Sequence, residues 1–149
     1  MYVAVSSPGP GRVDAAVLDA DGAERERVQL HADEFPVWAA ETEREHPRWV
    51  WGDTRRWYPS LLTAGVRVER CVDLRMCRRI LRTATAASGT ALARAPRDRW
   101  DGPAHAAPAT SAALFELAEP EPDDDPAEEL RRQRAAIAES SAPGRLALL

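Results

Sequence analysis

Four arginines between residues 75 and 82 have the type and spacing that phosphate binding requires. Arg75, Arg78, Arg79 and Arg82 follow one another at i, i+3, i+4 and i+7, so a helix would place them in one stripe. Guanidinium groups pair well with phosphate oxygens, so the stripe predicts contact with a nucleic-acid backbone or docking of another domain. The alternative is a solvated helix face, because all twenty basic residues of this chain are arginine.

Asp53 and Asp73 are the carboxylates that best fit a catalytic position, since each follows a run that predicts a strand. Both also stand where a helix would begin, and capping of that helix is the interpretation that we favour. His31, His46 and His105 are scattered along the chain and define no metal-binding or catalytic set.

Other residues with reactive side chains do not form a recognised constellation. The loop SSPGPG at residues 6–11 lacks the Gly-Lys-Ser/Thr ending of a phosphate-binding loop. Ser6 and Ser7 have no His or Asp partner at an informative spacing. Cys71 and Cys77 are too few for a disulfide scaffold and form no CxxC pair, so neither disulfides nor zinc is predicted.

The segment from Trp49 to Leu81 contains the elements that must position these residues. Residues 49–51 form a short apolar run typical of a buried strand, and a helix should follow Asp53 and end at Gly65. Val66 and Val68 alternate with charged residues, which predicts a second strand before a helix that begins at Asp73. We therefore expect a parallel pair of strands with a right-handed crossover.

The residues before this segment predict three strands and a helix. Strands are expected over residues 2–5, 13–18 and 25–30, joined by turns rich in Gly, Pro and Asp, as an antiparallel meander whose third strand is an edge. A helix beginning near Asp33 should end at His46-Pro47. The order β-β-β-α-β-α-β-α predicts an α/β fold with a mixed sheet and flanking helices.

The chain divides into three parts by composition. Residues 1–83 form the predicted domain, and residues 84–124 are a predicted disordered linker rich in Ala, Pro and acidic residues, with an apolar island at residues 114–117 as a docking point. Residues 125–149 begin with Asp125-Pro126, which predicts a helix to about Ser140. Its apolar stripe is thin, so this helix needs a partner to be stable.

Charge and hydropathy limit the class of protein. Residues 1–83 contain 13 Arg and 13 acidic residues, so the predicted domain is neutral, which does not fit a strongly basic nucleic-acid module. No signal peptide and no apolar run long enough to span a membrane is evident. We expect a soluble, cytoplasmic protein without membrane contact.

Several strings of this chain are similar to the N-terminal region of the bifunctional 3′–5′ exonuclease/DNA polymerase proteins of high-GC bacteria, which belong to the family-A DNA polymerase type. These strings are LDADG at residues 18–22, RWVW at 48–51, YPSLLTAGVRVERCVDL at 58–74, ALFEL at 113–117 and GRLALL at 144–149. The resemblance implies a ribonuclease H-like, 3′–5′ exonuclease-like fold and a polymerase domain that follows in cis.

The resemblance also identifies the positions where the exonuclease carboxylates belong, and this chain lacks them. Such an enzyme holds two metal ions with four carboxylates. The first pair, Asp-x-Glu, would lie at Val5-Ser6-Ser7, and the next Asp would lie at Tyr58. Hydroxyl groups do not replace carboxylates as Mg²⁺ ligands. We therefore expect a catalytically inactive domain, and Mg²⁺ as a cofactor only if residual nuclease activity exists.

The expected function is positioning of the polymerase domain, or contact with its DNA, during replication or repair. Two alternatives remain open. One is a stand-alone protein-interaction module that uses the stripe of residues 75–82 or the apolar island of residues 114–117. The other is an active 3′–5′ exonuclease with non-standard metal ligands.

Overall fold

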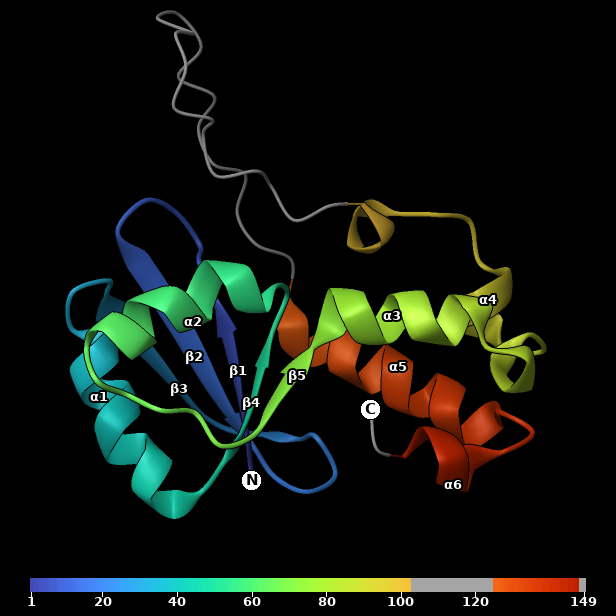
Figure 1. Cartoon of the computed structure of the whole chain (residues 1–149), viewed down its shortest axis with the longest axis horizontal. Helices are drawn as coiled ribbons and strands as arrows, with labels where there is room; N and C mark the ends of the chain where they lie inside the picture. Colours follow the sequence, from blue (N-terminus) through green and yellow to red (C-terminus); the bar gives the residue numbers. More distant parts are fainter. Residues whose placement is uncertain (103–124, 148–149) are drawn as a thin grey trace, which may run out of the picture.

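The computed structural model describes residues 1–102 and 125–147 of the chain (Figure 1). Its strands are β1 (Tyr2–Ser6), β2 (Arg12–Leu18), β3 (Glu24–His31), β4 (Arg48–Trp51) and β5 (Cys71–Asp73). Its helices are α1 (Phe35–Thr42), α2 (Thr54–Thr63), α3 (Leu74–Thr83), α4 (Ala91–Arg94), α5 (Pro126–Glu139) and α6 (Pro143–Leu146). Three short 3₁₀ turns complete the set, η1 (Glu43–Glu45), η2 (Thr85–Ala87) and η3 (Arg99–Asp101).

The five strands form one mixed sheet in the order β3-β2-β1-β4-β5. The first three strands are an antiparallel meander with β3 at the edge, whereas β4 pairs in parallel with both β1 and β5. Helix α2 connects the parallel strands β4 and β5. The predicted α/β architecture, the meander and the parallel crossover are therefore confirmed.

Alternation along the strands divides the core between the two faces of the sheet. Val3 and Val5 of β1 and Trp49 and Trp51 of β4 face α1 and α2, where they pack with aromatic residues of both helices. The ring of Phe35 lies 6.1 Å from that of Trp49 and 5.6 Å from that of Trp57. Such edge-to-face pairs stabilise a core beyond the area that they bury. The predicted burial of the strand at residues 49–51 is confirmed, since Trp49 and Trp51 are fully buried.

The opposite face of the sheet is covered by α3 and α5 (Figure 1). Ala4 of β1, Val50 of β4 and Val72 of β5 point to this side and pack with Leu74 of α3 and Leu130 of α5. The C-terminal helix α5 therefore has the partner that its thin apolar stripe requires. Asp125 begins the helix as predicted, accepting hydrogen bonds from the backbone N–H groups of residues 127 and 128.

The second parallel strand lies five residues later than the sequence predicts. Residues 71–73, not Val66 and Val68, pair with β4. Val66 instead completes the end of α2: its N–H bonds to the Leu61 carbonyl at 2.9 Å, and the N–H of Gly65 bonds to the Leu62 carbonyl at 3.0 Å. This is the Schellman arrangement, in which an apolar residue after the glycine packs back on the helix. The alternation of Val66 and Val68 reflects that packing and not a strand.

The predicted disordered linker also differs from the structure over residues 84–102. This stretch forms η2, α4 and η3, and it buries Leu92 and Trp100. Composition alone predicts disorder here because the segment is rich in small residues, but it folds against α3 and α5, which supply the apolar surface that it lacks. Residues 103–124, with His105 and the apolar island at 114–117, lie outside the described residues.

Within residues 1–102 and 125–147, no helix is long and apolar enough to cross a lipid bilayer.

Candidate functional site

The carboxyl ends of the parallel strands β1, β4 and β5 meet at one edge of the sheet, where ligands commonly bind in α/β folds. At this edge Ser6 ends β1 and Ser7 follows it, Asp53 lies shortly after β4, and Asp73 ends β5. The topology thus brings together the two carboxylates and the two serines that the sequence singled out.

Both carboxylates at this edge hold backbone N–H groups of helices. Asp73 caps α3 by accepting a hydrogen bond from the N–H of Met76 at 3.0 Å. It also accepts one at 2.8 Å from the N–H of Thr54, the first residue of α2. Asp53 accepts from the N–H of Arg55 at 2.8 Å and pairs with the Arg55 guanidinium at 2.9 Å. The hydrogen bonds from Arg55 lower the pKa of Asp53. The predicted capping role of both residues is confirmed.

The remaining polar side chains near this edge do not complete a catalytic set. The Ser7 hydroxyl donates to the carbonyl of Gly9 at 3.1 Å and stabilises the turn after β1. His46 lies at the surface with Nδ1 3.0 Å from Glu69, and His31 ends β3. In the described part of the chain, no three His, Cys, Asp or Glu side chains are grouped so that they could hold a metal ion.

The four arginines of α3 do not form one solvated stripe. Arg78 is only 3 % exposed and lies on the same side of the helix as the buried residues Leu74, Cys77 and Leu81. Its Nη1 donates to both carboxylate oxygens of Glu129 on α5, at 2.8 and 3.0 Å. Helix α3 therefore directs a charge inward, against another helix.

Arg78 also holds the segment that contains η3. Its Nη2 donates to Asp98 at 2.8 Å and to Asp101 at 3.2 Å. Arg82 donates to Asp101 from Nη2 at 2.9 Å and to the carbonyls of residues 95 and 96. Three carboxylates and two guanidinium groups thus connect α3, η3 and α5; we call these five residues (78, 82, 98, 101 and 129) the polar cluster.

The other two arginines of the stripe have different surroundings. The Arg75 guanidinium lies over the ring of Trp100, 5.3 Å from its centroid, and donates to the carbonyls of Arg99 and Gly102. Arg79 is exposed. Of the four predicted nucleic-acid contacts, only Arg79 therefore extends freely into solvent, and the other three hold parts of the chain together.

The spacing of the polar residues on α5 is a signal for the polar cluster that is present in the sequence. Glu129, Gln133 and Ala136 lie at i, i+4 and i+7 on α5 and share its buried face. Gln133 donates to the Leu74 carbonyl and to Glu129, both at 2.8 Å. Polar residues at buried helical spacing predict polar partners across the interface.

Cys77 is a core residue and not a reactive thiol. Burial raises its pKa to about 11, so the thiolate is scarce at neutral pH. Cys71 is exposed as a residue, but partial burial of its thiol also raises the pKa of that group.

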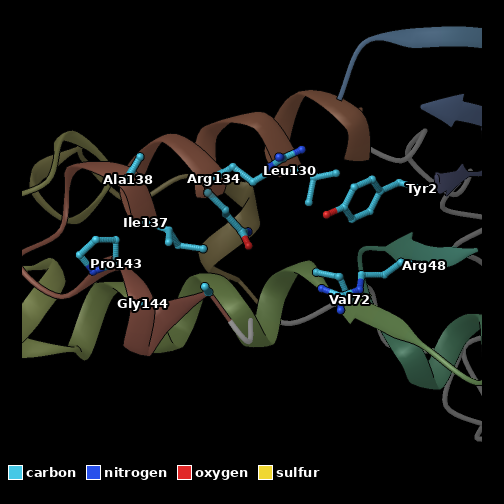
Figure 2. Close-up of a pocket in the computed structure, with 11 residues that line it drawn as sticks. Tyr2, Arg48, Val72, Leu130, Arg134, Ile137, Ala138, Pro143 and Gly144 are labelled. Atoms are coloured by element: carbon cyan, nitrogen blue, oxygen red, sulfur yellow. The ribbon is translucent and has the colours of Figure 1, made fainter. Parts of the chain in front are cut away.

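A pocket of about 450 Å³ lies at the other end of the sheet, between β1, β4 and β5 and the helices α5 and α6. Figure 2 shows Tyr2, Arg48 and Val72 on the strand side of this pocket, Leu130, Arg134, Ile137 and Ala138 on α5, and Pro143 and Gly144 on α6. Gln133 and Ala147 complete the lining. No sequence motif points to this pocket, because its walls come from segments far apart in the chain.

The pocket is mainly apolar but contains two guanidinium groups. Arg134 donates to the carbonyl of Ala20 at 2.8 Å and lies over the ring of Tyr2, 5.5 Å from its centroid. Arg48 is partly buried, and its guanidinium has no hydrogen-bond or ion-pair partner among residues 1–102 and 125–147. None of the described residues that line the pocket is a carboxylate.

Comparisons with protein-family models, with curated proteins and with solved structures each give no match for this chain.

Proposed function

We propose that this chain is the 3′–5′ exonuclease-like N-terminal region of a family-A DNA polymerase, without nuclease activity of its own. In this proposal it positions the polymerase domain in cis, or the DNA on which that domain acts, in replication or repair. The nucleotidyl transfer itself belongs to the polymerase domain.

The strand arrangement supports the ribonuclease H-like part of this proposal. A three-stranded meander, followed by two crossover strands parallel to β1, gives the order β3-β2-β1-β4-β5. A ribonuclease H-like domain has this arrangement, and its catalytic carboxylates belong where β1 and β4 end. Two of the strings that resemble the polymerase family lie on or between β4, α2 and β5: RWVW at residues 48–51 and YPSLLTAGVRVERCVDL at residues 58–74.

The residues at this edge support the proposed absence of nuclease activity. Ser6 and Ser7 occupy the end of β1, where the metal-binding pair of carboxylates belongs. Asp53 and Asp73 are the carboxylates that remain there, and each accepts hydrogen bonds from the N-terminus of a helix. A two-metal mechanism needs several carboxylates free to hold the ions that activate water and stabilise the leaving oxygen.

The polar cluster supports a positioning role. It fixes α5 and the segment of η3 against α3 through charge-assisted hydrogen bonds. We propose that this contact fixes the orientation of the polymerase domain in cis relative to the sheet. Contact of DNA with the arginines of α3 would then fall mainly to Arg79, because Arg75, Arg78 and Arg82 are occupied.

A nuclease assay tests the absence of activity. The chain is incubated with a 5′-labelled single-stranded DNA oligonucleotide and Mg²⁺ or Mn²⁺, and we expect the oligonucleotide to keep its length. Shortening from the 3′ end that depends on the metal, and that is lost in Asp53→Asn but kept in the exposed control Asp21→Asn, would contradict the proposal and favour an exonuclease with non-standard ligands.

The size of the native polypeptide tests the link to a polymerase. An antibody against this chain, applied to an extract of the source cells, should detect a species several-fold heavier than 16.4 kDa. A species of 16.4 kDa alone would contradict a polymerase domain in cis. That result would favour the stand-alone interaction module.

A further inference from the structure

We propose that the pocket between α5, α6 and the strands β1, β4 and β5 binds a small anionic amphiphile. Arg48 would hold the acid group, and the apolar part would contact Val72, Leu130, Ile137 and Pro143. This site is distinct from the edge at which β1, β4 and β5 end, and it does not depend on the proposed function.

The pocket follows from the way that α5 covers the sheet. Tyr2 lies two residues before Ala4 on β1, Arg48 lies two residues before Val50 on β4, and Val72 pairs with Val50. Because side chains alternate along a strand, all three point to the same face as these core residues. Leu130 is buried on this face, whereas Tyr2 and Arg48, at the beginnings of β1 and β4, stay partly exposed. Helix α6 then turns back and closes the space on its other side (Figure 2).

The charge of the lining indicates the sign of the ligand. Arg134 is already occupied by the Ala20 carbonyl and the ring of Tyr2. Arg48 has no such partner among the described residues, and it is partly removed from water at an apolar wall. A partly desolvated cation without a counter-ion is unfavourable, and a carboxylate or phosphate placed beside it would form charge-assisted hydrogen bonds.

The size and polarity of the pocket indicate the rest of the ligand. About 450 Å³ is within the range of small-molecule sites, which are mostly apolar with a few polar groups that fix the orientation of the ligand. The hydroxyl of Tyr2 points into the space between α5 and the strands, where it can donate to the same acid group (Figure 2). An acid group attached to an apolar chain fits this distribution.

Isothermal titration calorimetry with decanoate tests the proposal on the full chain. We expect saturable binding of one decanoate per chain, below the concentration at which decanoate forms micelles. Arg48→Gln should weaken this binding roughly tenfold or more, because a hydrogen bond between two charged groups is lost. Arg44→Gln, which changes an exposed arginine outside the pocket, should leave the affinity unchanged.

A second variant blocks the pocket without removing a charge. Gly144 lines the pocket, and a Cβ added there would meet no atom within 4 Å, so Gly144→Leu adds a bulky side chain to this wall without displacing its neighbours. We expect this variant to keep the circular dichroism spectrum of the parent chain and to lose decanoate binding. Arg145→Leu adds the same side chain at the next position, which does not line the pocket, and should bind normally.

Four outcomes would overturn the proposal. The first is a parent chain that shows no saturable binding, and the second is that folded Arg48→Gln and Gly144→Leu variants both bind like the parent. The third is decyltrimethylammonium binding as tightly as decanoate, which would show that the charge of the ligand does not matter. The fourth is a dimer in analytical ultracentrifugation that Gly144→Leu dissociates, which would assign the pocket to a second copy of the chain.

Discussion

Arg78 shows how this protein keeps a charge in its interior. Its guanidinium is bonded to Glu129, Asp98 and Asp101, and the Glu129 side chain is fully buried. Desolvation of two such charges is costly, and their attraction offsets it only when the remaining polar atoms are also bonded. Gln133 supplies one of these additional bonds to Glu129. Removal of one partner should therefore cost far more than the pair itself contributes.

Replacement of Arg78 tests this reasoning. Arg78→Met should lower the free energy of unfolding by about 3 kcal/mol or more, because Glu129 then stays buried without a cation. Urea unfolding followed by tryptophan fluorescence measures the change. Arg79→Met is the matched control on the exposed side of the same helix, and it should change stability by no more than about 0.5 kcal/mol.

The double variant Arg78→Met/Glu129→Leu separates the net contribution of the ion pair from the cost of leaving Glu129 buried without a cation. Because it removes both charges, it should be more stable than Arg78→Met alone. Equal losses in Arg78→Met and Arg79→Met would show that burial of Arg78 contributes nothing specific.

Helix ends are the elements whose details the sequence predicts best. Asp53, Asp73 and Asp125 accept backbone hydrogen bonds at the starts of α2, α3 and α5, and Gly65 ends α2 with φ of +80°. These signals are local, because a cap needs only a side chain that can reach a nearby N–H group, or a residue that tolerates positive φ.

Gly65→Ala should destabilise the chain by about 1 kcal/mol, because an L-residue at this positive φ is strained. A Cβ at this position meets no atom within 4 Å, so the loss would come from the backbone alone. The thermal unfolding midpoint measures it. Gly9→Ala is the control, since Gly9 also has free space but no positive φ; an equal loss in both variants would contradict the backbone explanation.

At the scale of the whole molecule, the polar cluster links α3, η3 and α5. Because it contains three carboxylates, the free energy of unfolding should depend on pH in the acidic range. Burial alone would raise the pKa of Asp101, but hydrogen bonds from Arg78 and from the backbone of Asp98 outweigh it, and the pKa lies below its ordinary value of 3.8. Arg82 and the carboxylates of Asp98 and Glu129 are the other charged groups that face this site. A carboxylate with a lowered pKa stabilises the fold above 3.8 and loses that effect as the pH falls through its folded pKa.

We expect the free energy of unfolding to be nearly constant above about pH 5 and to fall below pH 3.8. Other carboxylates with a lowered pKa, Asp19, Glu24 and Asp53, act in the same direction. The specific test is therefore the difference between the parent chain and Asp101→Asn, measured by urea unfolding at pH 5, 4 and 3. This difference should shrink as the pH falls, and a constant difference would contradict the role of Asp101; Asp33→Asn serves as the exposed control.

Much of the fold could be predicted because its signals are local. The meander, the Trp49–Trp51 strand, the crossover helix and the C-terminal helix all follow from periodicity and turn residues within a few positions of one another. The position of β5 could not be predicted in this way. Val66 and Val68 alternate like a strand, and only the end of α2 and the pairing with β4 determine that residues 71–73 form it.

The sequence by itself therefore determined the order of the five strands and of the helices α1, α2, α3 and α5, the caps of α2, α3 and α5, and the identity of the residues at the edge of the parallel strands. Only the tertiary structure decided what the arginines of α3 contact, that residues 84–102 fold, and that a pocket forms beside Arg48. The physical reason is that a cap or a turn depends on neighbours along the chain. The environment of a charge or a cavity depends instead on elements such as α3 and α5, which the sequence separates by tens of residues.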